Sequence, residues 1–291
     1  MRIGFHVSVG RGLVQTARHA RAIGCECLQI FVRSARGWRG RQYPEREVSE
    51  FRRLLAERAI GPLVIHSCYL VNLASPNPGL LARSRQAVSD DMQRAALLGS
   101  CTVTLHTGHD MGAGLDLGLR TLAESVRMVL LEAPPHMQLL LENAVGRGRR
   151  LGSEWEHFAR LLDALDGEPR LGICLDTCHT HAAGYRLDNP RWIGRTLREF
   201  AVSVGLGRLR LVHLNDSRGP AGSQLDRHQH IGRGTIGDQG FRALLRRRDL
   251  QDRCAILETP MDRPTDDARN IRHVRTLMRS LPRRAQGPKA H

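Results

Sequence analysis

Lysine is almost absent from this sequence of 291 residues, because only Lys289 contributes to the 44 Lys and Arg residues. Arginine therefore carries nearly all of the positive charge, and 29 Asp and Glu residues leave a formal net charge of +15. A bias toward arginine codons explains arginine in place of lysine, but it does not explain the excess of basic over acidic residues. That excess favours a polyanionic partner, with a basic surface that binds nothing as the open alternative.

Long apolar segments are absent as well. No run approaches the roughly 18–20 residues that span a bilayer, and residues 1–6 (MRIGFH) lack the apolar stretch of a signal peptide. We therefore expect a cytoplasmic protein with no membrane partner. With 41% apolar and 25% charged residues, the composition is that of a globular protein and not of a disordered one.

The cysteines do not form an even set. Seven of them are scattered along the chain, which argues for reduced thiols in the core and against a disulfide framework. Cys174, Cys178 and His179 look like part of a zinc knuckle, but no second Cys pair follows at the required spacing.

Eight short apolar runs of strand character repeat along the chain, each followed by a stretch with helical spacing. They are residues 2–8, 27–33, 62–67, 101–106, 137–143, 170–176, 209–216 and 254–259. Helical spacing is clearest at residues 78–98 and 115–131, and Ser153 is expected to open a further helix. The pattern predicts an α/β fold, a closed (β/α)8 TIM barrel. We expect a single domain over residues 1–281, followed by a flexible basic tail over residues 282–291.

Side chains that can bind a metal stand at the ends of six of these runs. They are His66, His106, Glu142, Asp176, His213 and Glu258. In a TIM barrel the carboxyl ends of the strands converge on the rim that carries the active site. Because burying an unpaired charge costs several kcal/mol, a metal site explains these positions better than core packing does.

Three more candidates lie in the loops after the strands: His179, Asp226 and His228. Imidazole mixed with carboxylate suits zinc, and manganese less selectively. Since one ion takes three or four protein ligands, the nine candidates predict two or three ions. The remaining histidines are expected to be structural, and the roles of His6 and His109 stay open.

A series of motifs follows in chain order. They are residues 4–8 (GFHVS), 66–73 (HSCYLVNL), 141–143 (LEN), 175–179 (LDTCH), 213–217 (HLNDS), 226–228 (DRH), 231–237 (IGRGTIG) and 257–260 (LETP). Together they resemble the endonuclease IV family of apurinic/apyrimidinic endonucleases, also called deoxyribonuclease IV, from residue 3 to about residue 280. The combination is specific, whereas no single motif is.

This resemblance implies a TIM barrel with three zinc ions, or Mn²⁺ at one site, over a bent DNA duplex. By motif, the first ion would be held by His66, His106 and Glu142, the second by Glu142, Asp176, His213 and Glu258, and the third by His179, Asp226 and His228. Glu142, which would bridge two ions, is the expected catalytic residue. Clustered zinc would supply hydroxide near neutral pH and neutralise developing negative charge.

The activity implied is that of a DNA-repair hydrolase. It would cut the phosphodiester 5′ of an abasic site, leaving a 3′-hydroxyl and a 5′-deoxyribose phosphate, and would trim blocked 3′ ends. The partner would be double-stranded DNA with such lesions, bound by a monomer. Arg36, Tyr69 and Leu70 match positions that the family uses to fill the gap left by the extruded nucleotide, and rim packing is their alternative role.

Four positions depart from the pattern of the family. Ser34 stands where asparagine is usual, and Gly37 where a bulkier polar residue is usual. Thr107 and His109 stand where proline and serine are common. None of these is a candidate metal ligand, so the departures bear on DNA binding and not on metal binding.

A sugar isomerase or epimerase on the same barrel is the competing interpretation. Such an enzyme would use one divalent ion on Glu142, Asp176, His213 and Glu258. It has no use for the other five candidate ligands together, which favours the nuclease. An inactive DNA-binding barrel is disfavoured because every ligand position is retained.

Overall fold

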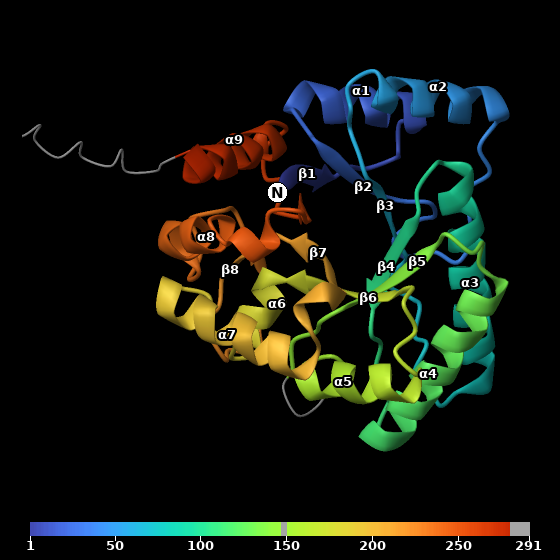
Figure 1. The fold of residues 1–291 in the computed structure, drawn as a ribbon. Helices are drawn as coiled ribbons and strands as arrows, with labels where there is room; N and C mark the ends of the chain where they lie inside the picture. Colours follow the sequence, from blue (N-terminus) through green and yellow to red (C-terminus); the bar gives the residue numbers. More distant parts are fainter. Residues whose placement is uncertain (147–149, 280–291) are drawn as a thin grey trace, which may run out of the picture.

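The computed structural model describes residues 1–146 and 150–279, and it shows the predicted parallel barrel surrounded by helices (Figure 1). Around the closed barrel the strands follow the order β1, β10, β7, β6, β5, β4, β3 and β2. The predicted TIM-barrel fold is therefore confirmed. The predicted tail over residues 282–291 lies outside the described residues.

The strands begin where the apolar runs do, within one residue. Their bounds are β1 (Arg2–His6), β2 (Cys27–Phe31), β3 (Leu63–His66), β4 (Thr102–His106), β5 (Gln138–Glu142), β6 (Leu171–Asp176), β7 (Leu209–His213) and β10 (Cys254–Leu257). A short antiparallel pair, β8 (Asp216–Ser217) and β9 (His228–Gln229), follows β7 and was not predicted.

The helices form the outer layer. They are α1 (Leu13–Ile23), α2 (Glu45–Ala56), α3 (Pro78–Leu97), α4 (Leu115–Glu132), α5 (Trp155–Ala164), α6 (Thr177–Ala182), α7 (Pro190–Ser203), α8 (Gly237–Leu245) and α9 (Asp266–Arg279), with 3-10 turns at Leu206–Arg208 and Arg248–Leu250. Among the described helices none is long and apolar enough to cross a membrane. The expectation that Ser153 opens a helix is wrong, because α5 begins at Trp155 and the Ser153 hydroxyl donates to the Arg150 carbonyl at 2.7 Å.

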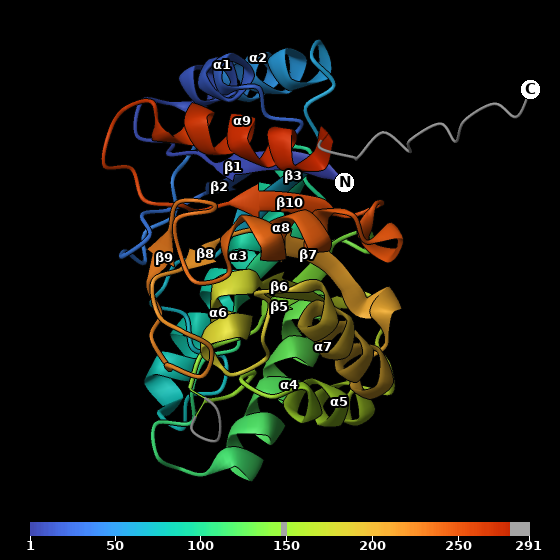
Figure 2. The ribbon, with the colours of Figure 1, turned by 90° about the vertical axis from the view of Figure 1, so that its left-hand side faces the viewer.

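The register of the parallel ladder aligns the strand ends. His106 pairs with Glu142, and Asp176 pairs with His213. Such pairing requires close strands, and at Gly4 a Cβ atom would lie 2.1 Å from the Cys27 carbonyl oxygen, so only glycine fits at this point of β1. The candidate ligands consequently share one end of the barrel, the end that carries β8 and β9 in Figure 2 and lies opposite the N-terminus.

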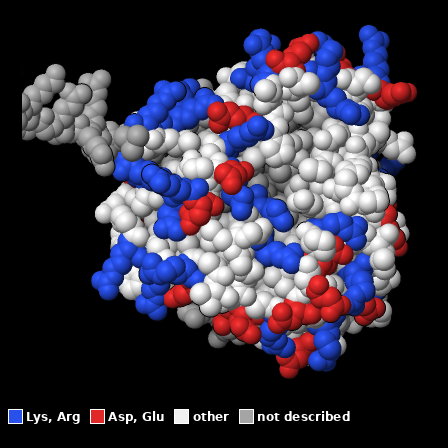
Figure 3. All heavy atoms as spheres, viewed as in Figure 1, with Lys and Arg blue, Asp and Glu red and all other residues white. Residues whose placement is uncertain are grey.

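The opposite face also carries charge. Figure 3 shows the side on which the N-terminus lies, and basic side chains are spread over it among fewer acidic ones. A cavity of about 480 Å³ at this end is lined by residues that include Arg2, Arg210 and Arg253. The net charge of +15 therefore does not by itself locate a surface for a polyanion.

A buried ion pair joins the loop after β2 to the outer layer. The Arg33 guanidinium donates to Asp91 on α3 at 2.8 Å and to the Ala87 carbonyl at 2.7 Å, and it also donates to the Trp38 carbonyl. The second Asp91 oxygen accepts from the Ser67 hydroxyl at 2.9 Å. With both charged side chains almost fully buried, the pair fixes the loops after β2 and β3 relative to each other.

Replacing Arg33 by Met should destabilise the protein by about 3–5 kcal/mol, because Asp91 would be left buried without its partner. The double variant Arg33→Met, Asp91→Leu should recover most of that loss, since no buried charge remains. Chemical denaturation of both variants measures the difference. Equal stability of the single and double variants would contradict this role of the pair.

Candidate metal centre

The structure brings the nine candidate ligands together in the three sets named above. In each set the ligand atoms lie within 4.8 Å of one another: His66, His106 and Glu142; Glu142, Asp176, His213 and Glu258; and His179, Asp226 and His228. Glu142 belongs to the first two sets, which places it between them. The sequence placed six of these residues by strand position alone.

The first two sets meet at the Glu142 carboxylate, which is 1% exposed. One of its oxygens, Oε2, lies 3.2 Å from His66 Nε2, 3.6 Å from His106 Nε2 and 3.2 Å from His213 Nδ1. The same nitrogen, His213 Nδ1, is 3.3 Å from Glu258 Oε2. A carboxylate with imidazole nitrogens on several sides is arranged as a bridging ligand.

The third set is built by local structure that the strand pattern does not contain. Asp176 caps the N-terminus of α6 by accepting from the His179 backbone N–H at 2.8 Å, and this turn directs His179 toward Asp226. His179 Nε2 lies 3.2 Å from Asp226 Oδ1. Pairing of β8 with β9 brings His228 beside Asp176, with 3.6 Å between Nε2 and Oδ2.

Three of these imidazoles are oriented by backbone carbonyls. The Nδ1 atoms of His66, His179 and His228 lie 2.6, 2.9 and 3.1 Å from the carbonyl oxygens of Ser67, Asn143 and Glu258, respectively. Because a carbonyl only accepts, each Nδ1 carries a proton, and each Nε2 is left as the nitrogen that can bind a metal ion. This arrangement is typical of histidines that ligate a metal.

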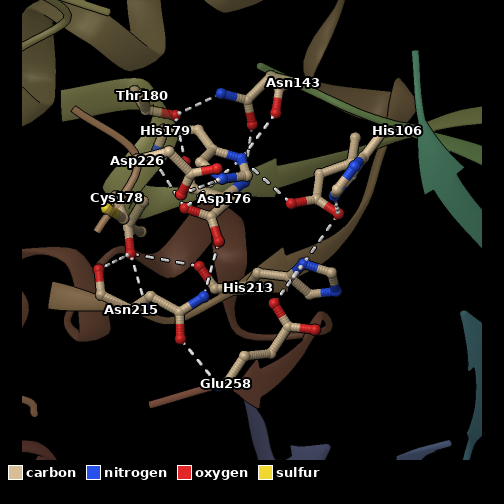
Figure 4. Close-up of polar contacts among 12 residues, drawn as sticks. His106, Asn143, Asp176, Cys178, His179, Thr180, His213, Asn215, Asp226 and Glu258 are labelled. Atoms are coloured by element: carbon tan, nitrogen blue, oxygen red, sulfur yellow. Dashed lines mark hydrogen bonds and ion pairs between the residues drawn. The ribbon is translucent and has the colours of Figure 1, made fainter. Parts of the chain in front are cut away.

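Two asparagines beside the candidate ligands are hydrogen-bonded to Asp176 and Glu258 (Figure 4). Asn215 donates from Nδ2 to Asp176 Oδ2 at 2.6 Å and accepts from the Glu258 N–H at 2.8 Å. Asn143 accepts from the Asp176 N–H at 2.7 Å. The sequence offered one signal for both residues, namely their position one or two residues after a ligand.

The carboxylates and imidazoles of the cluster shift one another's pKa values. Burial opposes ionisation of Glu142, yet His213 and His106 beside it hold the pKa of this carboxyl well below its usual value. Burial also opposes protonation of His179, yet Asp176, Asp226 and Glu142 raise the pKa of the imidazole well above its usual value. Four carboxylates in one largely buried cluster therefore depend on nearby positive charge to stay ionised.

Two buried nitrogens test whether metal ions fit. Within residues 1–146 and 150–279, His213 Nδ1 and His228 Nε2 have no hydrogen-bond partner, although each faces carboxylate oxygens. A divalent cation between such groups would satisfy all of them. Cys174 forms a further candidate group with Glu142 and His213, and Cys178 forms one with Asp176 and His228. Burial raises the pKa of both thiols to about 12, which favours the imidazole and carboxylate donors over thiolate.

The expected DNA-binding residues lie on the same rim. Tyr69 is 53% exposed, and its ring stacks on His106 with 5.6 Å between ring centroids. The Tyr69 N–H donates to the Ala35 carbonyl at 2.9 Å, so the loop that carries Arg36 is attached to the loop that carries Tyr69 and Leu70. Arg36 is exposed and Leu70 is half-buried. The three residues therefore occupy adjoining loops beside the metal centre.

A cavity of about 240 Å³ opens between this rim and the metal centre. Its lining includes the apolar or aromatic side chains of Tyr69, Leu70 and Met111 and the candidate ligands His106, His179 and Asp226. The cavity thus combines apolar surface with three candidate ligands.

Two of the departures from the family pattern, Thr107 and His109, line this cavity, and the structure gives each a local role. The Thr107 hydroxyl donates to the Leu151 carbonyl at 2.6 Å, a bond that proline could not make. The Asn72 amide holds the His109 backbone at both its N–H (3.1 Å) and its carbonyl (2.8 Å). The intervening Gly108 has φ +80 and approaches Asn72 too closely for a Cβ atom.

The other two departures, Ser34 and Gly37, lie in the loop after β2. There the Gly37 N–H donates to the Ser34 carbonyl at 3.1 Å. This bond closes a tight turn next to Arg36, so both departures shape the loop that carries one of the expected DNA-binding residues.

Comparison with known proteins gives one consistent result. A family profile described as xylose isomerase-like TIM barrel matches residues 17–281. A protein named probable endonuclease 4 from Methanoculleus marisnigri is 38% identical over 276 residues, which are 94% of this chain and 98% of the relative. The crystal structure of endonuclease IV from Thermus thermophilus is 36% identical, with a TM-score of 0.85 over 97% of this chain and 100% of that one. A D-tagatose 3-epimerase-like protein shares the fold at 17% identity, with a TM-score of 0.70 over 96% of this chain and 97% of that one.

Elemental analysis of the purified protein should find about three divalent ions per chain, because the ligands divide into three sets that share one carboxylate. His228→Ala should remove about one ion, since His228 completes only the third set. His273→Ala is the matched control, because His273 binds Asp238 on the outer layer. A single ion in the unaltered protein would instead favour the epimerase interpretation.

Proposed function

We propose, from the premise that this chain belongs to the endonuclease IV family and is therefore a nuclease of the hydrolase class, that it incises DNA 5′ of abasic sites with resident zinc ions. The products would be a 3′-hydroxyl and a 5′-deoxyribose phosphate, and blocked 3′ ends would be trimmed by the same chemistry. The observation that carries the proposal is the convergence of nine imidazole and carboxylate ligands in three sets beside a small cavity.

The three sets of candidate ligands would hold the ions that carry out the reaction. Zinc bound in these sets would supply a hydroxide near neutral pH and offset the charge that develops on the phosphate. Glu142 would hold the first two ions, because its carboxylate lies between His66 and His213. Asp226 and His228 lie toward the open side, since Asp226 is half-exposed, and they would meet the substrate phosphate through the third ion. Manganese at one site remains compatible with this donor set.

The cavity supports a substrate that lacks a base. Its volume of about 240 Å³ lies below the roughly 300–1,000 Å³ of sites that take drug-sized ligands. A sugar phosphate matches that size better than a complete nucleotide does. Extrusion of an abasic residue also costs less than extrusion of a paired base. Preference for abasic sites would thus follow from the shape of the cavity and from the side chains that fill the gap left in the base stack.

The proposal distinguishes this chain from the epimerases on the same fold. Glu142, Asp176, His213 and Glu258 would suffice for a single ion in a sugar-converting enzyme. The other two sets add ligands from β3, β4, α6 and the β8–β9 pair. Several ions around one phosphate suit phosphodiester hydrolysis, whereas an epimerase has no such need.

Duplex DNA with one abasic site should be incised without added Mg²⁺, because the ions would be resident. Extension of the upstream product by a polymerase tests for the 3′-hydroxyl, and an intact duplex is the control. Prolonged chelation should abolish incision slowly. Undiminished incision after verified metal removal would exclude the mechanism.

Glu142→Gln should lower kcat more than DNA affinity, because an amide is a poor bridge between cations.

The double variant Tyr69→Ala, Leu70→Ala should lose its preference for abasic over intact duplex. These side chains would offset roughly a few kcal/mol of unstacking, and they are not ligands. Metal content and the salt dependence of binding to intact DNA should stay unchanged, since phosphate contacts by arginine set the latter. Leu131→Ala, at a 76% exposed position on α4, is the control. A preserved preference would assign these residues to rim packing and leave Arg36 as the candidate for recognition.

A further inference from the structure

Gln29 is a buried polar residue that lies among the candidate ligands without belonging to any of the three sets. It stands in β2 opposite His6 of β1 in the ladder, and its side chain is completely buried. Its amide contacts two ligands at once. Nε2 lies 2.7 Å from Glu258 Oε1, and Oε1 lies 2.9 Å from His213 Nε2. An uncharged side chain thus connects two ligands from different strands.

The chemistry of the partners determines the orientation of this amide. An ionised carboxylate only accepts hydrogen bonds, so the amide nitrogen must face Glu258 and the amide oxygen must face His213. The opposite orientation would place two oxygen atoms 2.7 Å apart, which is repulsive. Gln29 Oε1 therefore accepts a hydrogen bond, and His213 Nε2 must carry the proton.

This proton determines which nitrogen of His213 can bind a metal. With Nε2 protonated, the lone pair lies on Nδ1, which faces Glu142 Oε2 at 3.2 Å and Glu258 Oε2 at 3.3 Å. His66, His179 and His228 obtain the same kind of orientation from backbone carbonyls. His213 obtains it from a side chain, so a single substitution can remove its support.

We propose that Gln29 is a positioning residue of the metal centre, which selects the metal-binding tautomer of His213 and holds Glu258 beside it. The inference rests on the metal centre of the proposed function. Both candidate ligands to which Gln29 is hydrogen-bonded belong to the second set, and among the hydrogen bonds of the described residues none joins its side chain to a ligand that is exclusive to the first or third set. Its effect is therefore local to one ion.

His6 gives Glu258 a second contact on the same side. Its Nδ1 atom lies 3.1 Å from Glu258 Oε1 and 2.9 Å from Gln29 Nε2. Its ring packs on Phe31 with 4.4 Å between the ring centroids. His6 can keep Glu258 in place when the amide is removed, but it has no contact with His213 among the hydrogen bonds of the described residues. Loss of Gln29 should consequently act mainly through His213.

Gln29→Leu removes both hydrogen bonds and keeps an apolar group of similar size in the barrel. The ions released to a chelator are followed with time from fully zinc-loaded protein. We expect one ion per chain to leave about 10- to 100-fold faster than from the unaltered protein, and the others to leave at unchanged rates. In incision assays with saturating zinc, KM for abasic DNA should stay within about twofold while kcat falls.

Thr104→Val is the matched control, because Thr104 is also completely buried in the barrel and its hydroxyl has no hydrogen-bond partner among the described residues. It changes barrel packing next to His66, its partner in the ladder, without removing a hydrogen bond to a candidate ligand. Uniformly faster release of all ions from both variants would reduce the role of Gln29 to barrel stability. Unchanged release from a folded Gln29→Leu protein would overturn the proposal.

The readouts separate this inference from the proposed function. If the unaltered protein binds several ions but does not incise abasic DNA, the proposed function fails while the release rates still test Gln29. If it incises abasic DNA and Gln29→Leu releases every ion at the normal rate, only the inference fails.

Discussion

Repulsion among carboxylates at one end of a barrel is the constraint on which the rest of this structure depends. Glu142, Asp176 and Glu258 are largely buried within a few ångströms of one another, and Asp226 closes the group from the open side. In a medium of low polarity such a group is stable only when cations compensate it. The imidazoles between the carboxylates present lone pairs, so they cannot supply that compensation while they act as ligands. Metal binding at this rim would therefore be coupled to its folding.

The loops that are expected to read the DNA are attached to the same centre. Ser67, whose carbonyl orients His66, also donates its hydroxyl to Asp91, and Asp91 holds Arg33 in the neighbouring loop. The backbone of Tyr69 is bonded to that loop as well. A rigid connection of this kind keeps the rim at a constant distance from the ligands, which suits an enzyme that must place one phosphodiester next to its ions.

The barrel itself does not distinguish a nuclease from a sugar epimerase, since both kinds of relative share the fold. The difference lies in what the loops add to it. His179 comes from the short helix after β6, and Asp226 and His228 come from the segment that closes the β8–β9 pair. These additions extend a group of candidate ligands of the size that one ion requires into three such groups. Function on this fold is thus decided at the carboxyl ends of the strands.

The sequence alone predicted the barrel and its candidate ligands, because strand periodicity and the residue types at strand ends are local properties. His66, His106 and Glu142 were predicted as candidates in this way, and their grouping followed from the resemblance. Only the tertiary structure revealed Gln29, which bonds residues 184 and 229 positions away, and the Arg33–Asp91 pair, separated by 58 positions. A buried Gln or Arg has no local signature of its partner, because that partner is set by the closure of the barrel and the packing of helices upon it.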